Sequence, residues 1–106
     1  MDDPTVPEID VNDLEARMVG GVHVLDVREP HEYDEAHIAG VLLMPLESVP
    51  TRIAEVPTDQ PVYIVCRTGG RSHHAAEFLR QQGVDAINVA GGTKGWIEAG
   101  KPFETG

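Results

Sequence analysis

The chain has 106 residues, of which 41% are hydrophobic and 25% are charged, and this composition is typical of a soluble globular domain. Its formal net charge of -10 argues against nucleic acid or an anionic membrane surface as a partner, because both need a basic face. No apolar run approaches the length of a membrane span, and the acidic first residues are unlike a signal peptide, so we expect a cytoplasmic protein.

The first part of the chain predicts a tail followed by a capped helix. Residues 1–7 show no periodicity, so we expect a flexible tail and then a single domain over residues 8–106. Asp10 is a good helix N-cap, and apolar residues at helical spacing predict a helix that ends at the glycine pair 20–21. The patterns that follow predict a strand (22–27), a polar turn (28–40), a short strand (41–44) and a helical stretch (46–56).

The second part of the chain alternates strands and helices more clearly. The predicted elements are a buried strand (61–65), a helix up to residue 82, a short strand (86–89) and a last helical turn capped by Thr93. Trp96 in that last turn is assigned to packing. Because strands alternate with helices throughout, the sequence predicts an α/β fold with a mainly parallel sheet.

The loop 66–72, with the sequence CRTGGRS, lies between the buried strand and the longest predicted helix. Gly69 and Gly70 permit backbone dihedrals that turn successive N–H groups inward, and Ser72 can cap the helix that follows. These N–H groups would then surround the sulfur of Cys66, at the carboxyl end of a strand where α/β sheets place ligands. The loop therefore predicts a cradle for an anion.

Cys66 is the single cysteine, so it has no partner for an internal disulfide and its free thiol needs an explanation. A lone cysteine is most often a small buried hydrophobe. Here, a helix N-terminus together with Arg67 and Arg71 favours the thiolate over the thiol. The pKa of cysteines in such settings is about 3.5 to 7.5, against about 8.5 for a free thiol, so we expect Cys66 to be a nucleophile.

Three motifs in this chain resemble the rhodanese family of sulfurtransferases. They are the loop 66–72, the segments 25–29 (LDVRE) and 35–40 (EAHIAG), and the segment 91–96 (GGTKGW). The resemblance extends from about residue 9 to about residue 100. It implies a rhodanese-like three-layer fold, in which helices flank a mainly parallel sheet of five strands, with a short first strand near Ile9.

The resemblance also implies an activity, that of a thiosulfate sulfurtransferase. The Cys66 thiolate would attack the outer sulfur of thiosulfate or another persulfide donor, and cyanide or an acceptor thiol, such as that of a sulfur-carrier protein, would then remove the sulfur from the persulfide. No metal or other cofactor is implied. The residues expected to bind the substrate anion are Arg67, Thr68, Gly69, Gly70, Arg71 and Ser72, and those expected to support the site are Asp26 and Arg28. We prefer Arg67 for substrate contact, because Arg71 could equally fix the loop through backbone carbonyls.

Several histidines carry weaker signals. His31, Glu35 and His37 match no common zinc spacing, and a polar turn explains them better. His73 and His74 are adjacent on a helix, so their side chains point about 100° apart and cannot both serve one site. We expect both to be exposed on the surface.

Two other function classes remain open. A phosphatase or arsenate reductase of the same fold also uses a cysteine loop that ends in arginine, and a non-catalytic module could use this fold to bind a partner protein. Four residues separate Cys66 from Arg71, whereas the phosphatase-type loops have five. The shorter loop favours a single sulfur atom over a tetrahedral oxyanion, and the cysteine itself argues against a module without catalysis.

Overall fold

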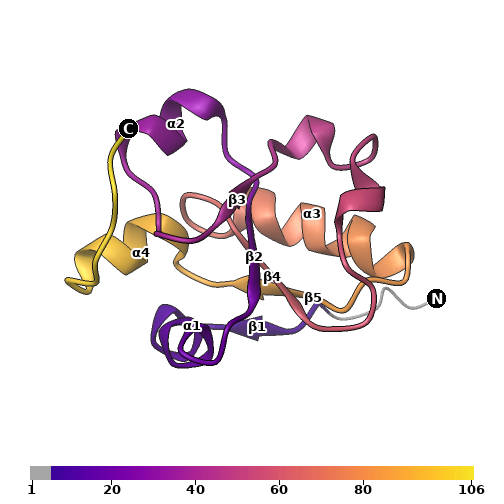
Figure 1. The fold of residues 1–106 in the computed structure, drawn as a ribbon, viewed down its shortest axis with the longest axis horizontal. Helices are drawn as coiled ribbons and strands as arrows, with labels where there is room; N and C mark the ends of the chain where they lie inside the picture. Colours follow the sequence, from indigo (N-terminus) through magenta and orange to yellow (C-terminus); the bar gives the residue numbers. More distant parts are fainter. Residues whose placement is uncertain (1–5) are drawn as a thin grey trace.

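A five-stranded sheet forms the centre of the structure, a computed structural model that describes residues 6–106 (Figure 1). Every pair of neighbouring strands is parallel, and the spatial order is β1-β5-β4-β2-β3. The strands are β1 (Glu8–Ile9), β2 (His23–Asp26), β3 (Leu42–Leu43), β4 (Val62–Val65) and β5 (Ala86–Val89). The predicted parallel sheet of five strands is confirmed, including the short first strand at Ile9.

Helices cover both faces of the sheet, which makes three layers. They are α1 (Val11–Met18), α2 (Pro30–Glu35), α3 (Gly70–Gln81) and α4 (Gly92–Glu98), with two 3-10 turns, η1 (Leu46–Ser48) and η2 (Ile53–Glu55). Because side chains alternate along a strand, β4 supplies Ile64 to the core under α3 and Tyr63 to the core under α1 and α4. Leu79 and Leu14 are fully buried in these two cores, and each contributes roughly 1.5–3 kcal/mol of hydrophobic stabilisation.

The predicted polar turn over residues 28–40 is wrong for its first half, because α2 lies there. Pro30 occupies the first helical turn, where its fixed φ is favourable. Glu29 and Glu32 form a capping box, in which each side chain accepts the backbone N–H of the other. No residue of α2 is buried, so the segment has no hydrophobic periodicity to reveal it.

Two further predictions need correction. The stretch 46–56 forms η1 and η2, with Pro50 between them, instead of one helix. The predicted flexible tail lies outside the described residues for 1–5 and is wrong for residues 6 and 7. Val6 is buried in the core under α3, and the carbonyl of Pro7 accepts the N–H of Asn88 at 2.9 Å.

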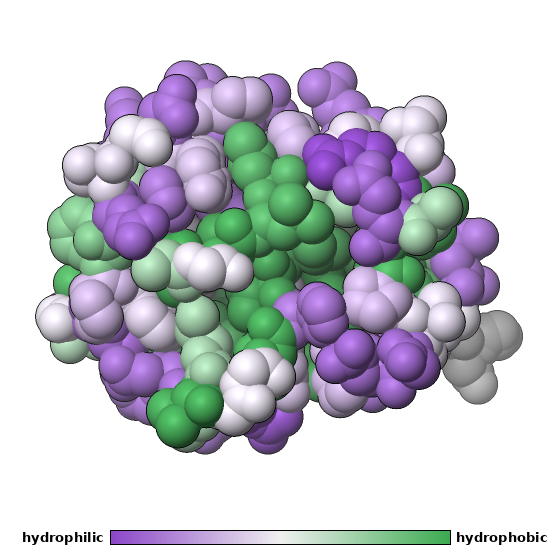
Figure 2. Space-filling view, in the orientation of Figure 1, coloured by the Kyte–Doolittle hydropathy of each residue, from purple (hydrophilic) through white to green (hydrophobic). Residues whose placement is uncertain are grey.

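One face of the molecule has a band of hydrophobic residues down its middle, with hydrophilic surface on both sides (Figure 2). In Figure 1, β3 lies in the same region of this view. This strand is at the edge of the sheet, and its Leu42 is 45% exposed.

Within residues 6–106, no helix is both long enough and apolar enough to cross a membrane.

Candidate active site

The loop that begins at Cys66 lies at the carboxyl end of β4, where the sequence placed it. Cys66 directly follows the strand, and α3 begins only four residues later at Gly70. The turn between them needs Gly69, whose φ of 123° is rarely adopted by residues with a side chain. The loop therefore bends sharply enough to face the sulfur with the first N–H groups of α3.

Two donors from this turn contact the sulfur of Cys66 directly. The N–H of Gly69 donates to Sγ at 3.1 Å, and the hydroxyl of Ser72 lies 3.3 Å from it. Burial acts to raise the pKa of the thiol, but hydrogen bonds from Ser72, Gly69 and Thr68 outweigh it, so the pKa lies below its ordinary value. The lowered pKa agrees with the predicted direction, but its main causes are the hydrogen bonds of the loop and not the charges of Arg67 and Arg71, to which the prediction also attributed it.

Ser72 does not cap α3, contrary to the sequence prediction. Gly69 is the N-cap, and Ser72 lies fully buried in the first turn. Its hydroxyl is also 2.5 Å from Oδ1 of Asn88, so its one proton serves either Asn88 or the sulfur. Asn88 in turn donates to Glu8 at 2.8 Å and to the carbonyl of Gly69 at 3.3 Å. The sequence analysis missed Asn88, although a buried amide within a strand was a usable signal.

The start of α4 holds the outer side of the loop. The carbonyls of Cys66, Arg67 and Thr68 accept the N–H groups of Thr93, Lys94 and Gly91 at 2.9, 3.0 and 3.2 Å respectively. Since the C=O and N–H of a peptide unit point in opposite directions, binding these carbonyls on the outside favours N–H groups that point to the inside. The motif 91–96 therefore shapes the cradle from behind.

Gly92 allows this close approach between α4 and the loop. Its φ is +56°, and an added Cβ would collide with the backbone of Cys66 and Arg67. Thr93 was predicted to cap this helix, which is wrong because Gly91 is the N-cap. The backbone N–H of Thr93 instead donates to the carbonyl of Cys66 in the loop. Its buried Oγ1 has no hydrogen-bond partner among the described residues.

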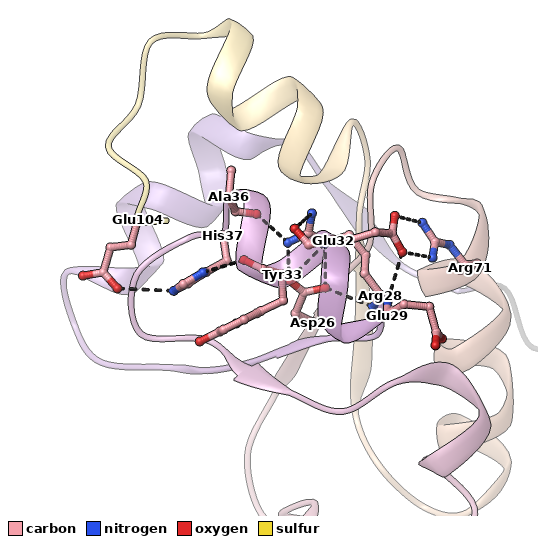
Figure 3. Close-up of polar contacts among 9 residues, drawn as sticks. All are labelled: Asp26, Arg28, Glu29, Glu32, Tyr33, Ala36, His37, Arg71 and Glu104. Carbon is pink, nitrogen blue, oxygen red and sulfur yellow. Dashed lines mark hydrogen bonds and ion pairs between the residues drawn. The ribbon is translucent and has the colours of Figure 1, made fainter. Parts of the chain in front are cut away.

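The two loop arginines have different surroundings. Arg67 is exposed and forms no ion pair with a described residue. It lines a hollow of about 330 Å³ between α2 and α4, whose other charged residues are Arg28, Lys94, Glu32, Glu35 and Glu98. Arg71 points to α2, where its guanidinium donates to both carboxylate oxygens of Glu32 at 2.6 and 2.8 Å (Figure 3). This contact was not among the predicted roles of Arg71.

Asp26 and Arg28 form a buried ion pair beside the loop, at the end of β2 (Figure 3). Arg28 donates to Asp26 Oδ2 at 2.7 Å, and Asp26 Oδ1 accepts the backbone N–H of Arg28 at 3.0 Å. The same guanidinium donates to the carbonyls of Ala36 at 2.8 Å and Glu32 at 3.4 Å, which anchors α2. The acceptors of Asp26 are therefore used by Arg28, and not by the N–H groups of the cysteine loop.

The histidines lie outside the cradle. The side chains of His73 and His74 are 46% and 77% exposed, as predicted. His37 is buried and stacks on Tyr33, and its ring nitrogens face the Tyr33 carbonyl and the Glu104 carboxylate (Figure 3). Residues 6–106 contain no group of three or more His, Cys, Asp or Glu side chains that could hold a metal ion. Trp96 is buried, so its assignment to packing is confirmed.

Comparison with known proteins identifies the family of this domain. A family model described as a rhodanese-like domain matches residues 10–99, which is most of the chain. The chain belongs to the rhodanese-like domain family. The resemblance carried by the three motifs is thereby confirmed.

A solved structure of a rhodanese-related protein from Thermoplasma volcanium superposes on this domain with a TM-score of 0.87 and 33% sequence identity. The superposition covers 94% of this chain and 99% of that one.

Two curated relatives have names that describe an activity. A sulfurtransferase from Allochromatium vinosum is 38% identical over 101 residues, which cover 92% of this chain and 94% of the relative. The thiosulfate sulfurtransferase GlpE from Actinobacillus pleuropneumoniae is 35% identical over 86 residues, which cover 80% of each chain. This rhodanese-like domain is therefore similar over most of its length to proteins named for sulfur transfer.

Proposed function

We propose that this protein is a thiosulfate sulfurtransferase that works through a persulfide on Cys66. The observation that carries the proposal is the sulfur of Cys66 inside its loop, where Gly69 and Ser72 are within hydrogen-bond distance and lower the thiol pKa. A thiolate is the reactive form of cysteine, and this site stabilises it before any substrate binds. The names of the two curated relatives support the same activity.

The reaction has two half-steps. The Cys66 thiolate attacks the outer sulfur of thiosulfate, the bond between the two thiosulfate sulfurs breaks, and sulfite leaves with the electron pair. Cyanide then attacks the outer sulfur of the persulfide to give thiocyanate, or an acceptor thiolate attacks it to give an acceptor persulfide, and the Cys66 thiolate returns. A sulfur-carrier protein is an acceptor of the second kind. Neither half-step needs a metal or a separate base, because the hydrogen bonds of the loop favour the thiolate form of the nucleophile.

The loop has a second task once sulfur has transferred. The persulfide anion extends the negative charge outward by one atom, towards the N–H groups of the loop. Donors fixed by the folded structure stabilise this charge without reorganisation, which is the main electrostatic contribution at such sites. Arg67, at the hollow between α2 and α4, is the cation that attracts thiosulfate.

The remaining parts of the proposal concern the whole protein. Residues 6–106 act as one domain, because Val6 and Pro7 are packed and bonded to the rest of the fold. Asp26 with Arg28 supports the site by holding α2 beside it. The protein works in the cytoplasm, where reducing conditions keep its single cysteine free.

The direct test is mass spectrometry of the intact protein after incubation with thiosulfate. We expect the mass to rise by one sulfur atom on Cys66, and cyanide to remove that atom with release of thiocyanate. The Cys66→Ser variant is the matched control and should gain no sulfur. Thiosulfate:cyanide turnover that persists in Cys66→Ser, or an unmodified Cys66 after incubation with thiosulfate, would overturn the proposed function.

A further inference from the structure

Arg71 and Glu32 make a two-pronged ion pair that joins the first turn of α3 to α2 (Figure 3). Both nitrogens at the end of the guanidinium take part, each on its own carboxylate oxygen, at 2.6 and 2.8 Å. Paired contacts of this kind are stronger and better oriented than a single one. The side chain of Glu32 is 19% exposed and that of Arg71 is 37% exposed, so solvent screens the pair only in part.

Glu32 is held in place independently of Arg71. Its Oε1 accepts the backbone N–H of Glu29 at 3.0 Å, which completes the capping box of α2. Arg28 fixes the other end of the same helix through the carbonyl of Ala36. Glu32 is therefore a fixed acceptor, and its position determines where the guanidinium of Arg71 lies.

The charge of Glu32 persists throughout the usual assay range. The hydrogen bond from Arg71 is the main reason that its pKa is lowered to about 2, with further lowering from the Glu29 N–H and from Arg28. Burial opposes this change and is outweighed. At neutral pH the Glu32–Arg71 pair is thus ionised and has no net charge.

Arg71 is nevertheless within electrostatic reach of the catalytic cysteine. The charge of Cys66 contributes to raising the pKa of Arg71, although the hydrogen bond to Glu32 is the larger cause. The sequence contains two loop arginines that could bind an anion. In the structure one of them, Arg71, forms an ion pair with Glu32. Arg67 is left to face the hollow.

We propose that Glu32 is a positioning residue that holds Arg71 away from the anion cradle and so limits the positive charge that an oxyanion meets there. The inference rests on the proposed function for its meaning, because it explains how a sulfurtransferase avoids being occupied by abundant sulfate or phosphate. Thiosulfate reacts through its outer sulfur and needs only the loop N–H groups and Arg67. A fully oxygenated anion would gain more from a second guanidinium.

The test measures how inorganic sulfate protects Cys66 from alkylation by iodoacetamide at constant ionic strength. Four proteins are compared: wild type, Glu32→Gln, Arg71→Met and the double variant. Glutamine keeps an oxygen that can accept the Glu29 N–H, so α2 retains its cap. One partly screened charge at such a site changes anion affinity by about three- to tenfold.

Charge balance fixes the expected order of the four proteins. Glu32→Gln releases Arg71, so the sulfate concentration for half-protection should fall by about three- to tenfold. Arg71→Met leaves Glu32 unpaired, so that concentration should rise. The double variant removes both charges and should lie within about twofold of wild type. This return towards wild type is the result that a purely structural role would not produce.

Three outcomes would overturn the inference. Weaker protection in both single variants would mean that the ion pair only maintains the shape of the loop. Equal tightening in Glu32→Gln and the double variant would show that Arg71 does not supply the attraction. Absence of protection in all four proteins would show that the cradle does not admit sulfate. None of these readings needs turnover, so they are separate from a failure of persulfide formation in the wild-type protein.

Discussion

Gly92→Ala offers the sharpest test of how α4 shapes the cysteine loop. The new Cβ would collide with backbone atoms of Cys66 and Arg67, which cannot move aside as a flexible side chain can. The residue also has a φ of +56°, a left-handed conformation that costs an alanine about 1–2 kcal/mol. Relief of the collision would break the hydrogen bonds from Thr93 and Lys94 to the loop carbonyls, each contributing about 0.5–1.5 kcal/mol. The expected loss of unfolding free energy is about 2–5 kcal/mol.

The assay is urea unfolding, with Gly100→Ala as the matched control. Gly100 has a φ of +77° and nothing within 4 Å of an added Cβ, so its substitution tests the backbone conformation alone. With a denaturant slope of about 1.5 kcal/mol/M, the midpoint should fall by roughly 1.3–3.3 M for Gly92→Ala and by roughly 0.7–1.3 M for Gly100→Ala. If the two variants lose the same stability, the close approach of α4 to the loop does not hold the cradle.

Three further predictions concern the loop and the ion pair on α2. Ser72→Ala removes a donor to the thiolate, so the pH profile of Cys66 alkylation should move to higher pH, and an unchanged profile would contradict that role. Arg67→Ala should raise the Michaelis constant for thiosulfate about three- to tenfold and leave that for a neutral acceptor thiol unchanged, whereas equal effects on both would refute the assignment. Because the pKa of Glu32 is lowered on folding, its ion pair stabilises the protein above the unfolded pKa of about 4.5. The stability difference between wild type and Glu32→Gln should thus be constant above about pH 5 and shrink as the pH falls towards 2.

The sequence predicted best those elements that bury an apolar face. The segment at β4 is short and β-rich, and all four of its residues are buried, which agrees with the pattern of a central parallel strand. Ala75, Ala76 and Leu79 recur at helical spacing along α3 and are buried in one core. In contrast, α2 buries nothing, so only its capping box and Pro30 could have revealed it.

The candidate site also has a part that the sequence predicted and a part that it did not. The loop 66–72 was predictable because its glycines, arginines and cysteine are contiguous. The side chains that bind its Arg71 and Ser72 were not predictable, since they come from distant parts of the chain. Glu32 and Arg71 are separated by 39 positions, and Ser72 and Asn88 by 16. Local patterns give no information about which distant carboxylate or amide a folded chain brings to a loop, so these contacts required the structure.

The absence of phosphatase activity is the prediction on which the choice of function depends most. Four residues separate Cys66 from Arg71. The N–H of Gly69 and the hydroxyl of Ser72 lie 3.1 and 3.3 Å from the sulfur of Cys66. Donors this close to Sγ leave little room for a phosphate ester to approach with its phosphorus in line with the sulfur, even where an oxyanion binds at the mouth of the loop. The arginine that would bind its oxygens is paired with Glu32. We therefore expect negligible hydrolysis of an aryl phosphate, together with thiosulfate:cyanide activity in the same preparation. A glycine inserted between Gly69 and Gly70 should depress sulfur transfer, because it moves the Gly69 N–H away from the sulfur. Phosphate-ester turnover by the unmodified protein that Cys66→Ser abolishes would reject the argument from loop size and favour a phosphatase.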